Sequence, residues 1–63
     1  MDHTEAAHEL GMDHAEDENN GKTVPRIYSG RQVAHALGIT DELPGDENVA
    51  LLDAYQRGRS DYY

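Results

Sequence analysis

Large apolar side chains are scarce in this chain and are concentrated in its second part. The 63-residue sequence has no phenylalanine, tryptophan or cysteine, and its only aromatic residues are four tyrosines. The large aliphatic residues are Leu10, Val24, Ile27, Val33, Leu37, Ile39, Leu43, Val49, Leu51 and Leu52. Nine of these ten follow position 23. A chain this short has room for one small domain and is marginally stable without crosslinks, so we expect one small core within residues 23–63.

The clearest helix signals lie in the middle of the sequence. Ser29 and Gln32 fit the capping box, in which each side chain satisfies a backbone amide of the other residue. An apolar stripe follows at helical spacing. Gly38 can adopt the left-handed conformation that ends helices. These signals predict a helix over residues 30–37, which must pack on another element because two turns are marginal alone.

A second amphipathic helix is predicted over residues 46–57. Its apolar face consists of Leu51, Leu52 and Tyr55. Asp46 and Glu47 suit the positive end of its dipole, and Gly58 can end it. Before both helices, residues 23–28 resemble a strand, but Pro25 lacks a ladder donor, so we expect an extended strap.

The first 22 residues have a different composition and form an acidic arm. Residues 1–20 carry seven acidic side chains and no basic one, which is typical of disorder. A weak helix is predicted over residues 5–12, and only where a neighbouring element holds it. A faint similarity at an offset of 27 residues, between Leu10-Gly11 and Leu37-Gly38, leaves an ordered N-terminus open.

These patterns together predict a mainly α fold. We expect a small unit of two to three helices with an extended strap over residues 23–63, preceded by the acidic arm over residues 1–22. The helix, glycine and apolar residue that end near Ile39 also resemble the first half of a helix-turn-helix. That resemblance implies DNA reading, but Pro44 interrupts the segment where the second helix of the motif would run.

No pattern for catalysis or cofactor binding is present. The four histidines, His3, His8, His14 and His35, are five, six and twenty-one residues apart, which does not match one metal-binding helix face. The sequence has no glycine-rich phosphate loop and no convincing nucleophile with a paired base. We therefore expect no metal, no cofactor and no enzymatic activity. No apolar run reaches the length of a membrane span, and we expect a cytoplasmic protein without membrane contact.

The charge indicates the kind of partner. A formal net charge of −8 repels nucleic acid and attracts basic surfaces. Our hypothesis is a small acidic binding module, such as an inhibitor or antitoxin, that engages a basic surface of a nucleic-acid-handling protein. The candidate contact residues are Glu16, Asp17, Glu18, Asp46, Glu47, Leu51, Leu52, Tyr55, Tyr62 and Tyr63. Three alternatives remain open: a minor subunit that orders within a larger assembly, a helix-turn-helix-like regulator, and, for the quaternary state, a homodimer.

Overall fold

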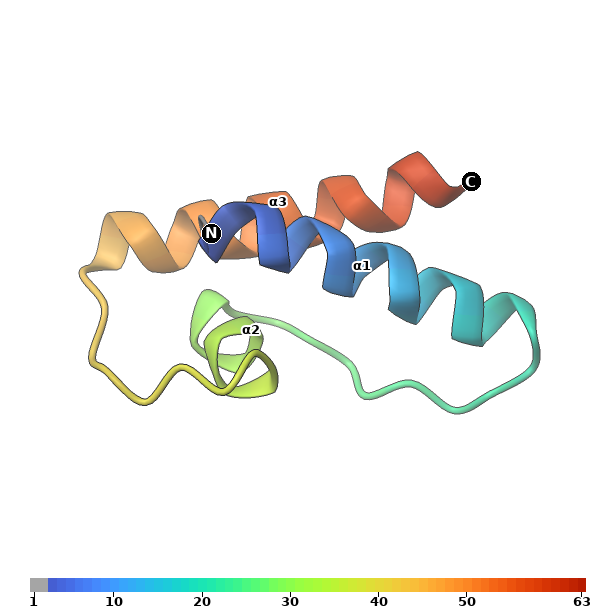
Figure 1. Cartoon of the computed structure of the whole chain (residues 1–63), viewed down its shortest axis with the longest axis horizontal. Coiled ribbons are helices and arrows are strands. Elements are labelled where there is room, and N and C mark those ends of the chain that lie inside the picture. Colours follow the sequence, from blue (N-terminus) through green and yellow to red (C-terminus); the bar gives the residue numbers. More distant parts are fainter. Residues whose placement is uncertain (1–2) are drawn as a thin grey trace.

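The computed structural model describes residues 3–63, which form three helices. They are α1 (His3–Asn19), α2 (Gly30–Ala36) and α3 (Gly45–Tyr62), and no strand occurs between residues 3 and 63 (Figure 1). The mainly α fold class is confirmed. None of the three helices is both long enough and apolar enough to cross a membrane.

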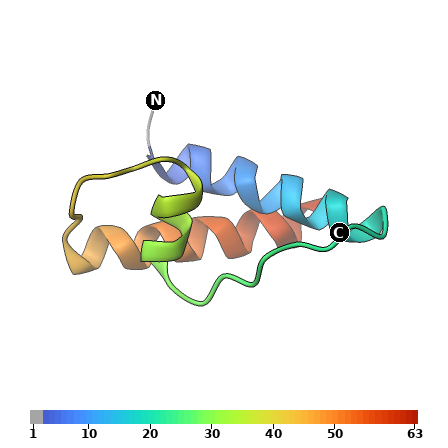
Figure 2. The same ribbon diagram turned by 90° about the horizontal axis from the view of Figure 1, so that it is seen from below.

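The two long helices lie side by side and run in the same direction (Figures 1 and 2). Their contacts advance together along both helices, from the early pairing of His8 with Gly58 to the hydrogen bond between Ala15 and Tyr63. A parallel pair requires a long return connection, because the end of α1 lies far from the start of α3. Residues 20–44 supply this connection and carry α2 across the N-terminal part of the pair (Figure 2).

Small residues bring α1 and α3 unusually close together. Ala7, Gly11 and Ala15 lie four residues apart on one face of α1, and all three are buried. A β-carbon on Gly11 would overlap the carbonyl oxygen of Tyr55, and one on Gly58 would overlap the carbonyl oxygen of His8. The two glycines therefore permit backbone-to-backbone contact, which no larger residue would allow.

Helix α1 is longer and better packed than the sequence patterns predicted. The expected weak helix over residues 5–12 extends from His3 to Asn19, and it passes through Gly11 without interruption. The arm over residues 3–19 is thus a packed element rather than a disordered extension; residues 1–2 of the predicted arm lie outside the described part. A core confined to residues 23–63 was also wrong, because Ala7 belongs to it.

Helix α2 forms as its sequence predicts. Ser29 accepts from the backbone N–H of Gln32, and the Gln32 side chain accepts from the N–H of Ser29, which completes the capping box. The helix ends at Ala36 with Leu37 as its C-cap, and Gly38 follows in the left-handed conformation with a φ of +78°. The N–H of Ile39 then donates to the carbonyl of Ala34 at 2.9 Å, as in a Schellman motif. The similarity between the Gly11 and Gly38 segments does not extend to conformation, because only Gly38 ends a helix.

Helix α3 begins at Gly45 and continues past its predicted end. Gly58 does not end the helix; it packs on α1, and the helix runs on to Tyr62. The connection from α2 to α3 covers residues 37–44, which is longer than the three- to four-residue turn of a helix-turn-helix. The resemblance to that motif therefore ends at Gly38.

The core lies where α2 packs against the long pair. Its buried residues are Ala7, Val33, Ala34, Leu51 and Tyr55. The predicted strap, residues 23–28, has no regular secondary structure, and its Ile27 packs against this core. The return segment thus runs beside the helices instead of adding a strand.

Candidate partner-binding surface

Four carboxylates form a stripe along the exposed side of α1. Glu5, Glu9, Asp13 and Glu16 are spaced by four, four and three residues, so they share one helix face. All four are exposed, and none of them has an ion-pair or hydrogen-bond partner in residues 3–63. We name these residues the acidic stripe. Glu9, Asp13 and Glu16 face away from α3 because the small buried residues occupy the opposite side of the helix, whereas Glu5 borders a hollow between α1 and α3.

The spacing of charges in the acidic stripe can be compared with the spacing of phosphates along a nucleic-acid strand. At about 1.5 Å of rise per residue, its four charges extend over about 16 Å, or one charge per about 5.5 Å. One strand of B-DNA carries one phosphate per about 3.4 Å of axis. The stripe is therefore a sparser line of negative charge, and it is held straight by a helix that packs along its length.

Residues 16–18 form an acidic run at the end of α1, and its side chains differ in whether they face solvent or make contacts within the fold. Glu16 is exposed and belongs to the stripe. Asp17 lies 3.7 Å from the Lys22 ammonium group, and Glu18 pairs with Arg59 of α3. Asp17 and Glu18 therefore help to fix the end of α1, and Glu16 is the member of the run with no partner.

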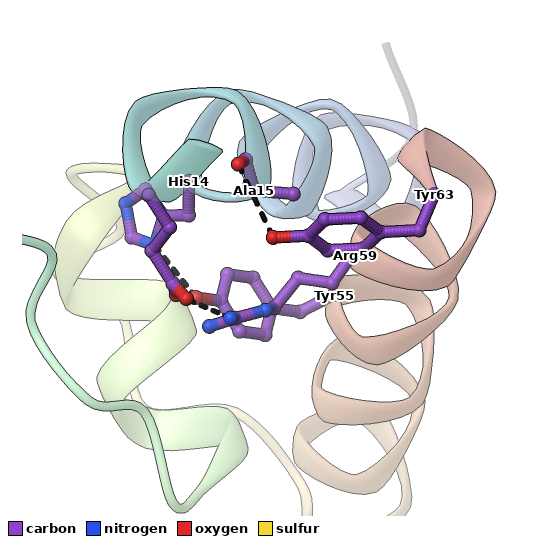
Figure 3. Close-up of polar contacts among 6 residues, drawn as sticks. His14, Ala15, Tyr55, Arg59 and Tyr63 are labelled. Carbon is purple, nitrogen blue, oxygen red and sulfur yellow. Dashed lines mark hydrogen bonds and ion pairs between the residues drawn. The ribbon is translucent and has the colours of Figure 1, made fainter. Parts of the chain in front are cut away.

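A polar cluster joins α1 to α3 behind this run (Figure 3). The Tyr55 hydroxyl and Nδ1 of His14 are hydrogen-bonded at 2.6 Å. The hydroxyl of Tyr55 raises the pKa of Arg59 through a hydrogen bond; partial burial opposes this shift, and Glu18 adds to it. The guanidinium thus keeps its charge and links both helices. Nearer the N-terminus, His8 and Asp61 make a second polar link at 2.7 Å.

The predicted apolar contact residues lie mostly inside the fold. Leu51 is 1% exposed and Tyr55 is 2% exposed, so both stabilise the core and neither is available to a partner of the folded chain. Leu52 is half-buried and packs against the same core. The helix pattern allowed this apolar face of α3 either to form the core or to contact a partner, and in the structure it forms the core.

The other predicted residues lie at the two ends of α3. Asp46 and Glu47 are exposed in its first turn and have no ion-pair partner among the described residues. Tyr62 is half-buried, with its hydroxyl 3.5 Å from the Asn19 amide. Tyr63 is 74% exposed, although its hydroxyl donates to the carbonyl of Ala15 at 3.4 Å (Figure 3). The tyrosines close the end of the helix pair and leave one ring in solvent.

The structure therefore brings together a different set of acids from the one that the sequence patterns selected. Glu5, Glu9 and Asp13 were not among the candidate residues, whereas Glu16 was. Their spacing of three to four residues is the signal that would have found them, once residues 3–19 were taken as one helix. No group of three or more potential metal ligands comes together within residues 3–63.

The chain has no match among known protein families, curated proteins or solved structures in the three comparisons made.

Proposed function

We propose that this protein is a small acidic binding module whose acidic stripe engages a basic surface on a nucleic-acid-handling protein. An inhibitor and an antitoxin are two proteins that would act in this way. The observation that carries the proposal is the row of four unpaired carboxylates on the exposed face of α1. Four unpaired like charges on one face repel each other, so they do not contribute to folding and are available to a basic partner.

The contacts of the polar side chains also support protein binding rather than catalysis. Polar side chains that could act on a substrate, such as His14 and Tyr55, bond to each other across the α1–α3 contact. The unpaired charges are instead on the outside of the fold. There a row of carboxylates can occupy the basic surface on which a partner protein would otherwise bind the phosphates of a nucleic acid.

The test begins with capture of the partner by the tagged chain from its host at low salt, with identification by mass spectrometry. The affinity of the purified pair is then measured between about 50 mM and about 500 mM salt, where screening of exposed charges becomes strong. We expect a steep loss of affinity with salt, and competition by DNA for the same partner surface. An affinity that does not change over this range would overturn the proposal.

Matched variants locate the contact. Glu9→Gln with Asp13→Asn removes two charges from the acidic stripe, and Asp41→Asn with Glu42→Gln removes two exposed, unpaired charges from the α2–α3 connection. We expect the first pair to weaken binding by about tenfold or more and the second pair to weaken it only slightly, since exposed charges act mainly at short range in salt. Equal effects would assign binding to net charge rather than to the stripe. Binding that resists both salt and these substitutions would favour the minor-subunit alternative.

A further inference from the structure

A hollow lined by basic side chains lies between the strap (residues 23–28), α2 and α1. It has a volume of about 360 Å³. The strap contributes Pro25, Arg26 and Ile27, α2 contributes Arg31 and His35, and His14 of α1 completes the wall. In a chain of net charge −8, this hollow has two arginines and two histidines on its walls and no carboxylate. We name it the arginine hollow.

Its two arginines are the basic residues that lack an acidic partner. Lys22, Arg57 and Arg59 each pair with a carboxylate, whereas Arg26 and Arg31 form no ion pair with any residue from 3 to 63. This is unexpected where acids outnumber bases thirteen to five. Arg31 also borders a neighbouring hollow whose wall includes Asp41 and Glu42, and neither of these carboxylates is within ion-pairing distance of it.

The remaining wall determines what kind of molecule fits. Pro25, Ile27 and Ala36 present apolar surface in the same hollow as the arginines. Guanidinium groups bind phosphate and carboxylate through several parallel hydrogen bonds. Two of them on one hollow suit the doubly charged phosphate group, which has three terminal oxygens to accept from both side chains. The volume is near the lower limit of small-molecule sites.

We propose that the arginine hollow binds a small organic phosphate, with Arg26 and Arg31 on the phosphate and Pro25 and Ile27 against an apolar body. This site is separate from the acidic stripe and does not depend on the function proposed above. The net negative charge of the chain opposes any anion at long range, so binding requires the local contacts of these two arginines.

The test is a titration of the full chain with phenyl phosphate at low salt, followed by two-dimensional NMR of the backbone amides. We expect saturable shifts in the strap and in α2, and weaker binding of inorganic phosphate, which has no apolar body. The double variant Arg26→Gln, Arg31→Gln should bind phenyl phosphate about a hundredfold more weakly, because it removes two charge-assisted contacts and each is worth about a factor of ten.

The matched control is Lys22→Gln with Arg57→Gln, which removes the same charge from two residues outside the hollow. It should change the affinity by less than about twofold, since screened charges at a distance contribute little. Unchanged thermal unfolding of both variants would show that they fold. No saturable shift in the wild-type chain, equal weakening in the two variants, or benzoate binding as tightly as phenyl phosphate would each overturn the proposal.

Discussion

Gly11 is one of the two glycines on which the contact between α1 and α3 depends. A methyl group there would overlap the carbonyl oxygen of Tyr55 and lie 3.0 Å from the backbone nitrogen of Arg59. Both atoms belong to the backbone of a helix, which moves only as a whole. In an exposed helix, by contrast, replacing glycine with alanine would stabilise by about 1 kcal/mol. The structure therefore reverses the sign that helix propensity alone predicts.

We expect Gly11→Ala to lower the free energy of unfolding by about 2 kcal/mol, because the cost of overpacking exceeds the gain in propensity. For a domain of this size that corresponds to a fall in Tm of about 10 °C, measurable by circular dichroism. The matched control is Gly45→Ala at the start of α3, where an added β-carbon meets no atom within 4 Å. The control should be neutral or slightly stabilising. A higher Tm for Gly11→Ala would show that the helices are not in backbone contact.

The same residue shows why α1 was underestimated from the sequence. Hydrophobic periodicity detects helices through large apolar side chains, and the buried face of α1 is made of Ala7, Gly11 and Ala15. The partner that makes Gly11 favourable is on α3, more than 40 residues away, so no local pattern contains it. The exposure of the acidic side chains was predictable from their charge. The sequence could not predict which apolar residues belong to the core and which contact a partner. Leu51 and Tyr55 fit both roles until α1 and α2 cover them.

At the scale of the element, α2 is the part whose local sequence determines its local structure. Its capping box and its glycine stop are both present as predicted, because these signals depend on residues within a few positions of each other. The seven-residue helix is too short to be stable alone, and its position depends on Val33 and Ala34 in the core.

We expect Ser29→Ala to lower the free energy of unfolding by about 1 kcal/mol, as is typical for loss of an N-cap side chain. Amide hydrogen exchange should become faster mainly in α2, with a smaller change in the α1–α3 pair. Ser60→Ala is the matched control, because Ser60 is an exposed residue within α3 and caps no helix. If exchange in α2 did not change, packing rather than capping would hold this helix.

At the scale of the whole molecule, repulsion between carboxylates opposes the fold. Eight of the acidic side chains in residues 3–63 have no ion-pair partner, and four others form pairs, of which the Arg59–Glu18 pair is partly buried and the rest are more exposed to solvent. Exposed pairs of this kind contribute at most about 1 kcal/mol each. The parallel arrangement adds to the repulsion, because the negative ends of both long helices lie at the same end as the acidic run that closes α1.

Salt should therefore stabilise this protein rather than weaken it. We expect Tm to rise by several degrees between about 20 mM and about 500 mM sodium chloride, as the screening length falls below the spacing of the carboxylates. The variant Glu5→Gln, Glu9→Gln, Asp13→Asn should have a higher Tm at low salt and a smaller response to salt, because it removes three charges of the acidic stripe. The same variant should bind the basic partner less well. Thermal unfolding and partner affinity, measured on one set of samples, would then change in opposite directions. A Tm that falls with salt would mean that the attraction within the ion pairs exceeds the repulsion between the carboxylates. The acidic stripe would then not destabilise the free chain, and a basic partner would have no repulsion to relieve.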